Sequence, residues 1–172
     1  YIDFDGVILD TEPLLFEEWR KNPDRIFLPE IEKIKYIQNQ NWENIVNNSE
    51  IINNSIYYLK NINPNDAIIL TRIHSLENEG VAKVTFLRKR EVKQNIIFVP
   101  FNLKKSVIVN AKDNVLVDDS LFNLDEWVQD DGIAIFFDKN NSNYDNWHKE
   151  NTNGYQRILS LKNVNMFKNS KR

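Results

Sequence analysis

Short apolar runs bounded by polar residues recur along the chain and predict buried strands. They cover residues 67–70, 96–99, 115–117 and 133–137, and a first run at residues 1–2 leads directly to Asp3. Asp, Asn, Pro, Thr or Gly bounds each run. Apolar runs of this length are typical of strands covered on both faces, as in a parallel sheet.

Longer stretches between these runs carry apolar residues at helical intervals. Residues 75–90 place apolar residues at helical spacing among charged ones, and Ser75 is well placed to cap the start of a helix. Residues 50–59 and 120–128 show the same helical spacing. The alternation of strands and helices predicts an α/β fold, a Rossmann-like, doubly wound parallel sheet.

Residues 11–49 interrupt this alternation. Their apolar residues and the prolines Pro13, Pro23 and Pro29 predict two or three short helices inserted after the first strand. Open α/β folds bind ligands at the carboxyl edge of the sheet, where such an insertion would lie. We therefore expect a small helical cap at residues 11–49 and a core built from residues 1–10 and 50–172.

The absence of cysteine and the scarcity of histidine limit the chemistry. The 172 residues include no Cys and two His. Disulfides, thiolate nucleophiles, zinc–cysteine sites and iron–sulfur clusters are therefore excluded, as are sites that need three histidines. Any catalysis must rest mainly on carboxylates, hydroxyls, Lys or Arg, with or without an oxygen-binding metal ion.

The charge balance gives no sign of a polyanionic partner. The 22 Lys and Arg residues against 25 Asp and Glu give a net charge of -3, which provides no overall positive field for a nucleic-acid polymer or an anionic membrane. No apolar run approaches the roughly 18–20 residues needed to cross a bilayer. We expect a soluble cytoplasmic protein that acts on a small molecule, and the sequence does not indicate its oligomeric state.

Two acidic pairs lie at the ends of predicted strands. Asp3 and Asp5, separated by one position, follow the first apolar run, and Gly6 allows the chain to turn steeply away. Asp118 and Asp119 end a later run. Because all strands of a parallel sheet end at one edge, these four carboxylates are predicted to converge there.

Asp is also common at strand ends because it caps helices and initiates turns. The occurrence of both pairs, at the first and at a late strand, favours a shared site instead. Carboxylates a few ångströms apart repel one another by roughly 1–4 kcal/mol per pair. Protonation or a divalent cation would relieve this repulsion, and an all-oxygen set of ligands favours Mg²⁺.

The first of these motifs resembles that of the haloacid dehalogenase-like (HAD) superfamily, which is dominated by Mg²⁺-dependent phosphatases. Residues 3–7, Asp-Phe-Asp-Gly-Val, match its first motif, an apolar strand followed by Asp-x-Asp-Gly. Asp10 and Thr11 are typical of members that carry a helical cap. Thr71, at the end of the next apolar run, matches the Ser or Thr of the second motif.

The later motifs follow in the same order. Lys105, with Lys104 as an unresolved neighbour, matches the lysine of the third motif. Residues 115–120 match the acidic pair of the fourth, and Asn123 stands where a downstream Asp or Asn is frequent. The surroundings of the last three motifs are similar to those of small 5′(3′)-deoxyribonucleotidase-type members.

The resemblance implies a role for each motif residue. Asp3 would be the nucleophile that forms an aspartyl-phosphate, and Asp5 would be the general acid and base. Thr71 and Lys105 would bind the phosphate and offset its charge. Arg72, next to Thr71, is a further candidate for substrate binding.

The resemblance also implies a Mg²⁺ site. Its ligands would be the carboxylates of Asp3 and Asp119 and the backbone carbonyl of Asp5, with Asp118 in support. The roles of Asp118 and Asp119 are open to exchange.

Together these residues predict a Mg²⁺-dependent phosphomonoester hydrolase acting on a small phosphorylated metabolite, with nucleoside monophosphates among the candidates. The alternatives are a phosphotransferase or phosphomutase of the same superfamily, and a catalytically idle HAD-like binding protein.

Overall fold

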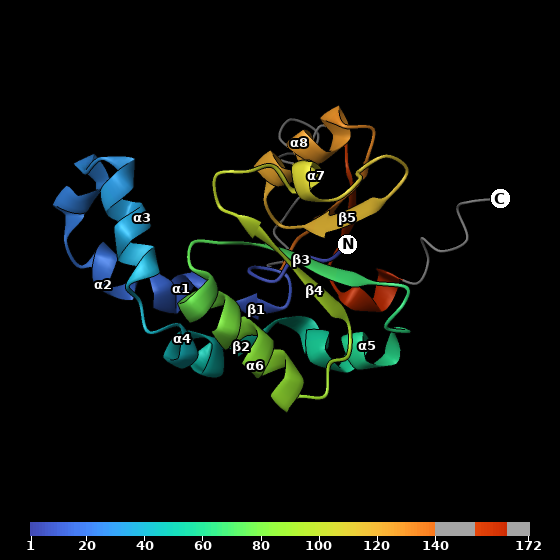
Figure 1. Ribbon diagram of the computed structural model, residues 1–172, viewed down its shortest axis with the longest axis horizontal. Helices are drawn as coiled ribbons and strands as arrows, with labels where there is room; N and C mark the ends of the chain where they lie inside the picture. The colour runs from blue at the N-terminus through green and yellow to red at the C-terminus, as the bar shows by residue number, and fades with distance from the viewer. Residues whose placement is uncertain (140–153, 165–172) are drawn as a thin grey trace.

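The computed structural model describes residues 1–139 and 154–164. Strands and helices alternate along most of this range (Figure 1). The strands are β1 (Leu9–Asp10), β2 (Glu50–Ile51), β3 (Ile68–Ile73), β4 (Asn95–Pro100), β5 (Val115–Asp118), β6 (Ile133–Phe137) and β7 (Gln156–Ile158).

The helices are shorter than the mean helix of globular proteins. The α-helices are α1 (Glu12–Leu15), α2 (Glu17–Arg20), α3 (Glu30–Gln38), α4 (Trp42–Asn48), α5 (Ser55–Asn61), α6 (Val81–Lys89), α7 (Lys105–Ile108) and α8 (Leu121–Gln129). Other helical segments are the 3₁₀-helices η1 (Pro23–Phe27) and η2 (Ile52–Asn54), the π-helical turn η3 (Leu76–Gly80) and a 3₁₀ turn at residues 161–164.

The N-terminal segment joins two groups of parallel strands. β3 pairs with β4, and β5 pairs with β6, which pairs with β7. Ile2 forms parallel bridges with both Ile69 of β3 and Val117 of β5. The N-terminal segment therefore lies between β3 and β5. Because all these pairings are parallel, Asp3 and Asp118 lie at strand ends on the same edge of the sheet.

Apolar side chains pack on both faces of this sheet. Ile69 and Val117 belong to a large cluster that includes residues of α5 and α6, whereas Leu70 and Leu116 belong to a second cluster with residues of α8. Neighbouring strand residues thus enter different clusters, because successive side chains point to opposite faces. Figure 1 shows α5 and α6 on one side of the sheet and α7 and α8 on the other.

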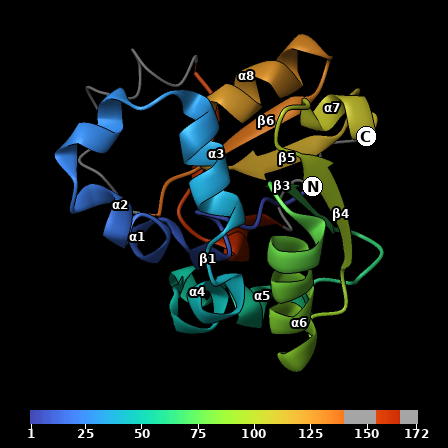
Figure 2. The same cartoon turned by 60° about the vertical axis from the view of Figure 1, so that its left-hand side comes forward.

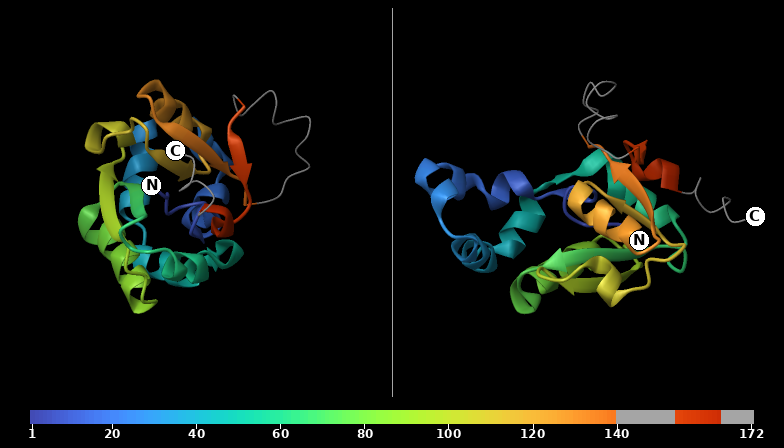
Figure 3. Two further views of the ribbon diagram at one scale, coloured as in Figure 1. Left: turned by 90° about the vertical axis from the view of Figure 1, so that its right-hand side faces the viewer. Right: turned by 90° about the horizontal axis from the view of Figure 1, so that it is seen from above.

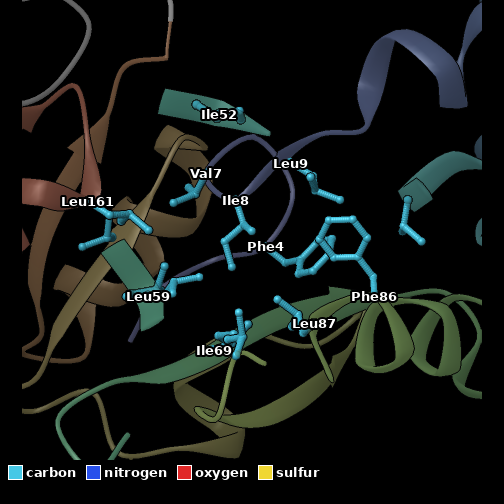
Figure 4. Close-up of a cluster of buried hydrophobic side chains, with 14 of the residues drawn as sticks. Phe4, Val7, Ile8, Leu9, Ile52, Leu59, Ile69, Phe86, Leu87 and Leu161 are labelled. Atoms are coloured by element: carbon cyan, nitrogen blue, oxygen red, sulfur yellow. The ribbon is translucent and has the colours of Figure 1, made fainter. Parts of the chain in front are cut away.

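The loop that follows Asp3 is fixed by buried apolar side chains. Phe4, Ile8 and Leu9 are fully buried, and Figure 4 shows them among the side chains of Phe86 and Leu87. Burial of each such side chain contributes about 1.5–3 kcal/mol. The backbone around Asp5 is therefore held firmly on the core.

The inserted residues 11–49 form α1, α2, η1, α3 and α4, more helices than the two or three expected from the sequence. β1 and β2 pair antiparallel where the chain leaves and re-enters the core. Figure 1 and the right-hand view of Figure 3 show that α2 and α3 extend away from the sheet, whereas α4 lies beside α6 (Figure 2). α4 buries Trp42, Ile45 and Val46 in the large cluster, to which α1 and α3 contribute one residue each, Leu15 and Ile37.

The predicted strands at residues 67–70, 96–99, 115–117 and 133–137 are confirmed, with no end more than three residues from its predicted position. The predicted helix at residues 50–59 is wrong in its first half. Residues 50 and 51 form β2, and Asn53 and Asn54 adopt left-handed φ values of 44° and 59°. Asn tolerates this conformation better than most residues, and the helix begins only at Ser55.

Ser75 and Ser120 begin helices, as expected: their hydroxyls accept hydrogen bonds from the backbone N–H groups of Asn78 and Asn123. β7 and the β1–β2 pair were not predicted. In residues 1–139 and 154–164, no helix combines the length and apolar character needed to cross a membrane.

Candidate active site

The sheet brings Asp3 and Asp118 together although 115 positions separate them in the chain. The backbone N–H of Asp3 donates to the carbonyl of Val117 at 2.9 Å, which aligns the two strand ends. Both carboxylates are almost completely buried. Lys105 lies between them, with its Nζ atom 2.7 Å from Oδ1 of Asp3 and 2.6 Å from Oδ2 of Asp118.

Lys105, rather than Lys104, lies in the acidic site. Lys105 begins the short helix α7 and is itself buried, with 2% of its surface exposed. Burial alone would lower the pKa of Lys105, but the charges of Asp118 and Asp3 outweigh it and raise the pKa. Lys104 points elsewhere and donates to Oε1 of Gln129 at 3.3 Å.

Asp118 and Asp119 have different surroundings. Asp118 accepts hydrogen bonds from the backbone N–H of Ser120 at 2.9 Å and from Nδ2 of Asn123 at 3.0 and 3.2 Å. Together with Lys105 these donors occupy both oxygens of Asp118. Asp119 has no hydrogen-bond partner for its carboxylate within residues 1–139 and 154–164.

Asp119 packs directly against Gly6. Gly6 has a φ of +74°, and a Cβ atom added there would lie 1.9 Å from Oδ2 of Asp119. A residue with a side chain would therefore displace the carboxylate as well as adopt a strained backbone conformation. Gly6 is required both for the turn after Asp5 and for the approach of Asp119.

Three carboxylates are close enough to share a metal ion. Asp3, Asp118 and Asp119 each offer one oxygen, and these oxygens lie within 4.8 Å of one another. Burial raises the pKa of Asp3 to about 7, even though Lys105 opposes the change, and the charges of Asp118 and Asp5 raise it further. The negative charge therefore exceeds what Lys105 neutralises.

Burial also raises the pKa of Asp119 well above its usual range, and the neighbouring charges of Asp118 and Asp3 add to this effect. Lys139 opposes it, but its Nζ atom is bonded to Oδ1 of Asp10 at 2.7 Å. An all-carboxylate set with excess negative charge fits a hard divalent cation such as Mg²⁺. The residues present thus fit the metal that the sequence predicted.

Asp5 lies beside this cluster and is turned toward the inserted segment. Its Oδ1 accepts a hydrogen bond from the hydroxyl of Thr11 at 2.8 Å, and its Oδ2 accepts one from Nζ of Lys83 at 2.5 Å. One third of its side chain is exposed. The hydroxyl of Thr71 lies 3.5 Å from Oδ2 of Asp5, at the limit of a hydrogen bond.

Thr71 and Arg72 lie near the end of β3. The Thr71 side chain is fully buried beside Asp5. Arg72 is bonded through Nη2 to Glu126 at 2.5 Å and lies over the ring of Phe122, while its buried Nε atom lacks a partner within the described residues. Arg72 is therefore held at the rim by α8.

A cavity of about 420 Å³ opens between Asp5 and the inserted helices. Apolar side chains of α1, α3 and α4 form one wall, and the stacked rings of His74 and Phe101, 4.9 Å apart, lie on the core side. The full lining is Asp5, Thr11, Glu12, Leu15, Phe16, Glu30, Lys33, Ile34, Ile37, Trp42, Arg72, His74, Glu79 and Phe101.

Sequence reasoning missed Lys83 and Glu79. Both are fully buried beside Asp5, and their side chains pair at 2.6 Å. A signal was present, because a Glu and a Lys four positions apart fall on the same face of the predicted helix as Phe86 and Leu87. Charged residues on an apolar face are rarely buried unless they are paired.

No protein-family model matches the sequence, and neither does any curated protein. Among solved structures, the chain is similar to one described as the crystal structure of HAD phosphatase from Thermococcus onnurineus. The TM-score is 0.62 and the identity 14%, over 99% of this chain and 97% of that one. At this identity the similarity shows the fold alone: the protein is a mixed α/β protein with parallel strands that shares its fold with that structure.

Proposed function

We propose that the protein is a Mg²⁺-dependent phosphomonoester hydrolase that acts through an aspartyl-phosphate on Asp3. The observation that carries the proposal is the position of Asp3, with its Oδ1 bonded to Lys105 and its carboxylate beside Asp118 and Asp119. Asp5 lies next to it at the cavity, where an ester oxygen would lie. HAD-like architecture supports the same interpretation.

In the first step, an oxygen of Asp3 attacks phosphorus and the bond from phosphorus to the ester oxygen breaks. Asp5 gives its proton to the departing oxygen. In the second step, Asp5 takes a proton from water, the water oxygen attacks phosphorus, and the bond to Asp3 breaks to release inorganic phosphate. Thr71 and Lys105 hold the phosphoryl oxygens and offset their charge.

Asp3, Asp119 and the backbone carbonyl of Asp5 would hold the Mg²⁺ ion, with Asp118 oriented toward Lys105, Ser120 and Asn123. The bound ion supplies positive charge between nucleophile and phosphate. The carboxylate of Asp119, which accepts no hydrogen bond from the described residues, supports its assignment as a ligand in preference to Asp118, whose oxygens are occupied by donors.

We further propose that residues 1–10 and 50–172 form a doubly wound core and residues 11–49 a cap. Part of the core range lies outside the described residues. The pairing of Leu9 with Ile51 and of Asp10 with Glu50 supports these boundaries, because it closes the core where the insertion begins and ends. α4 would anchor the cap, since Trp42 is buried in the core cluster.

A small phosphorylated metabolite fits the cavity of about 420 Å³, and its aromatic lining is compatible with a nucleoside monophosphate. The test is phosphate release from nucleoside monophosphates, sugar phosphates and an aryl phosphate, with and without Mg²⁺. Asp3→Asn should abolish it, whereas Asp24→Asn, an exposed residue outside the site, should not. Equal inactivity of wild type and Asp3→Asn on the whole panel would remove the proposal.

The same panel distinguishes the alternatives. A phosphomutase or phosphotransferase would move phosphate within or between substrates without releasing it. A binding protein would leave every phosphoester intact.

A further inference from the structure

Lys83 occupies an unusual position for a lysine. Its side chain is fully buried under Asp5, at the start of α6. Its Nζ atom lies 2.5 Å from Oδ2 of Asp5 and 2.6 Å from Oε1 of Glu79. Burial of an ammonium group is unfavourable unless the group is paired and hydrogen-bonded, and Asp5 and Glu79 provide that pairing here.

The donors of Lys83 are fully used. In addition to the two carboxylates, its Nζ atom lies 3.3 Å from the hydroxyl of Thr71 and 3.4 Å from the carbonyl of Arg72. The rings of Phe4 and Trp42 cover it, each at 5.2 Å. An ammonium group has three hydrogens, so none remains for a substrate. The role of Lys83 is therefore to hold the groups around it and not to bind substrate.

Glu79 fixes Lys83 from the other side. Its second oxygen, Oε2, accepts the backbone N–H of His74 at 2.8 Å, just after β3. Glu79 belongs to the π-helical turn η3, one helical turn before Lys83. The pair thus connects Asp5 to the end of the strand that carries Thr71.

We propose that Lys83, held by Glu79, is the positioning residue that fixes the Asp5 carboxylate for proton transfer. The inference deepens the proposed function and rests on it. Without Lys83, the hydrogen bonds that the described residues offer to the Asp5 carboxylate are the one from Thr11 to Oδ1 at 2.8 Å and the long one from Thr71 to Oδ2 at 3.5 Å. The one-third exposed carboxylate would then turn toward solvent. A proton donor must be held in hydrogen-bond reach of the departing oxygen, so this freedom lowers the rate.

A purely structural role for the buried pair makes a different prediction. A loss of stability would lower the amount of folded enzyme and reduce activity on all substrates equally. A loss of Asp5 orientation would affect mainly substrates whose leaving group needs a proton, such as alkyl phosphates. A nitrophenolate ion leaves readily without one.

The experiment compares kcat/KM for glycerol 2-phosphate and 4-nitrophenyl phosphate, with Mg²⁺ present. This parameter reports on the steps up to departure of the leaving group. The variants are Lys83→Met and Glu79→Gln/Lys83→Met, in which no buried charge at position 79 is left unpaired. Lys89→Met, exposed on the same helix, is the matched control.

We expect both Lys83 variants to lose about 100-fold in kcat/KM for the alkyl ester and about tenfold or less for the nitrophenyl ester. The control should match wild type. In an Asp5→Asn background, Lys83→Met should cost no further activity on the alkyl ester, because two residues that act as a unit are not additive.

Equal losses on the two esters, or a further loss in the Asp5→Asn background, would overturn the inference. Failure of the double variant to fold would assign Lys83 to stability alone and would overturn it as well. Suppose that wild type releases phosphate and Asp3→Asn does not, but the Lys83 variants keep the wild-type ratio of kcat/KM between the two esters. Only this inference then fails, and the proposed function stands. If wild type cleaves neither ester nor any compound of the panel, the proposed function fails with it.

Discussion

A Cβ atom on Gly6 would lie 1.9 Å from Oδ2 of Asp119. The turn after Asp5 therefore has no room for a side chain at position 6 while the Asp119 carboxylate keeps its place. The two residues are far apart in sequence. Because of this contact, the position of Asp119, a proposed metal ligand, depends on the shape of the turn after Asp5.

Gly6→Ala should therefore weaken Mg²⁺ binding as well as stability. The φ of +74° alone should cost about 1–2 kcal/mol of unfolding free energy. Gly154→Ala is the matched control, because Gly154 has a φ of +79°, and no atom of residues 1–139 and 154–164 lies within 4 Å of a Cβ added there. Calorimetric titration with Mg²⁺ should show weaker binding only for Gly6→Ala, and unchanged affinity in that variant would contradict the role of the contact.

Mg²⁺ itself should stabilise the fold. The ion would offset repulsion among Asp3, Asp118 and Asp119, and binding at about 100 times the dissociation constant adds roughly 2.7 kcal/mol. For a domain of this size that corresponds to an increase in Tm of about 5–10 °C. Thermal unfolding with Mg²⁺ and with a chelator measures it, and Asp119→Asn should lose most of the increase. An equal increase in that variant would place the ion elsewhere.

Lys105→Met should reduce kcat for the best substrate of the panel by about 100- to 1000-fold, because the positive charge beside Asp3 is lost. Lys104→Met is the control, since Lys104 points away from the acidic site and donates to Gln129 at the surface. Steady-state kinetics at saturating Mg²⁺ measures both. Similar losses in the two variants would contradict the assignment of Lys105.

The contribution of Glu79 to stability should depend on pH. Burial alone would raise the pKa of Glu79, but Lys83 and the bonds from His74 outweigh it and hold the pKa below its usual 4.5. A group with a lowered folded pKa stabilises the protein fully above the unfolded pKa, and the stabilisation is lost as pH falls through the folded value.

Glu79→Gln should therefore lower the unfolding free energy by about 1–3 kcal/mol at pH 7. The difference from wild type should shrink as pH falls below about 4.5. Urea unfolding at several pH values measures it, and Glu77→Gln, an exposed neighbour, should show no such trend. A difference that grows toward low pH would contradict the lowered pKa.

The sequence predicted the parts of the fold that depend on continuous apolar runs. β3, β5 and β6 bury most of their residues, and the partly buried β4 carries the same kind of continuous apolar run, so composition alone identifies all four. β7 was missed because its residues Gln156 and Arg157 are polar, as an edge strand allows. The start of α5 was misplaced because the left-handed conformation of Asn53 and Asn54 depends on the local turn, which no apolar periodicity records.

The candidate site was predictable where it follows from topology. Parallel strands end at one edge, so residues such as Asp3 and Asp118 could be placed together without coordinates. The partners of Asp5 could not be placed in this way. Thr11 and Lys83 reach it from the insertion and from α6, and such contacts depend on how these elements pack against the loop.

The bridging of Ile2 to both Ile69 and Val117 also determines when, during synthesis, the acidic cluster can exist. The opening residues leave the ribosome long before their second neighbour, β5, is translated. A nascent chain that ends ahead of residue 115 lacks Asp118 and Asp119, so it cannot assemble three crowded carboxylates. The repulsion among the three carboxylates thus arises only after both strands that flank the N-terminal segment, β3 and β5, have been synthesised.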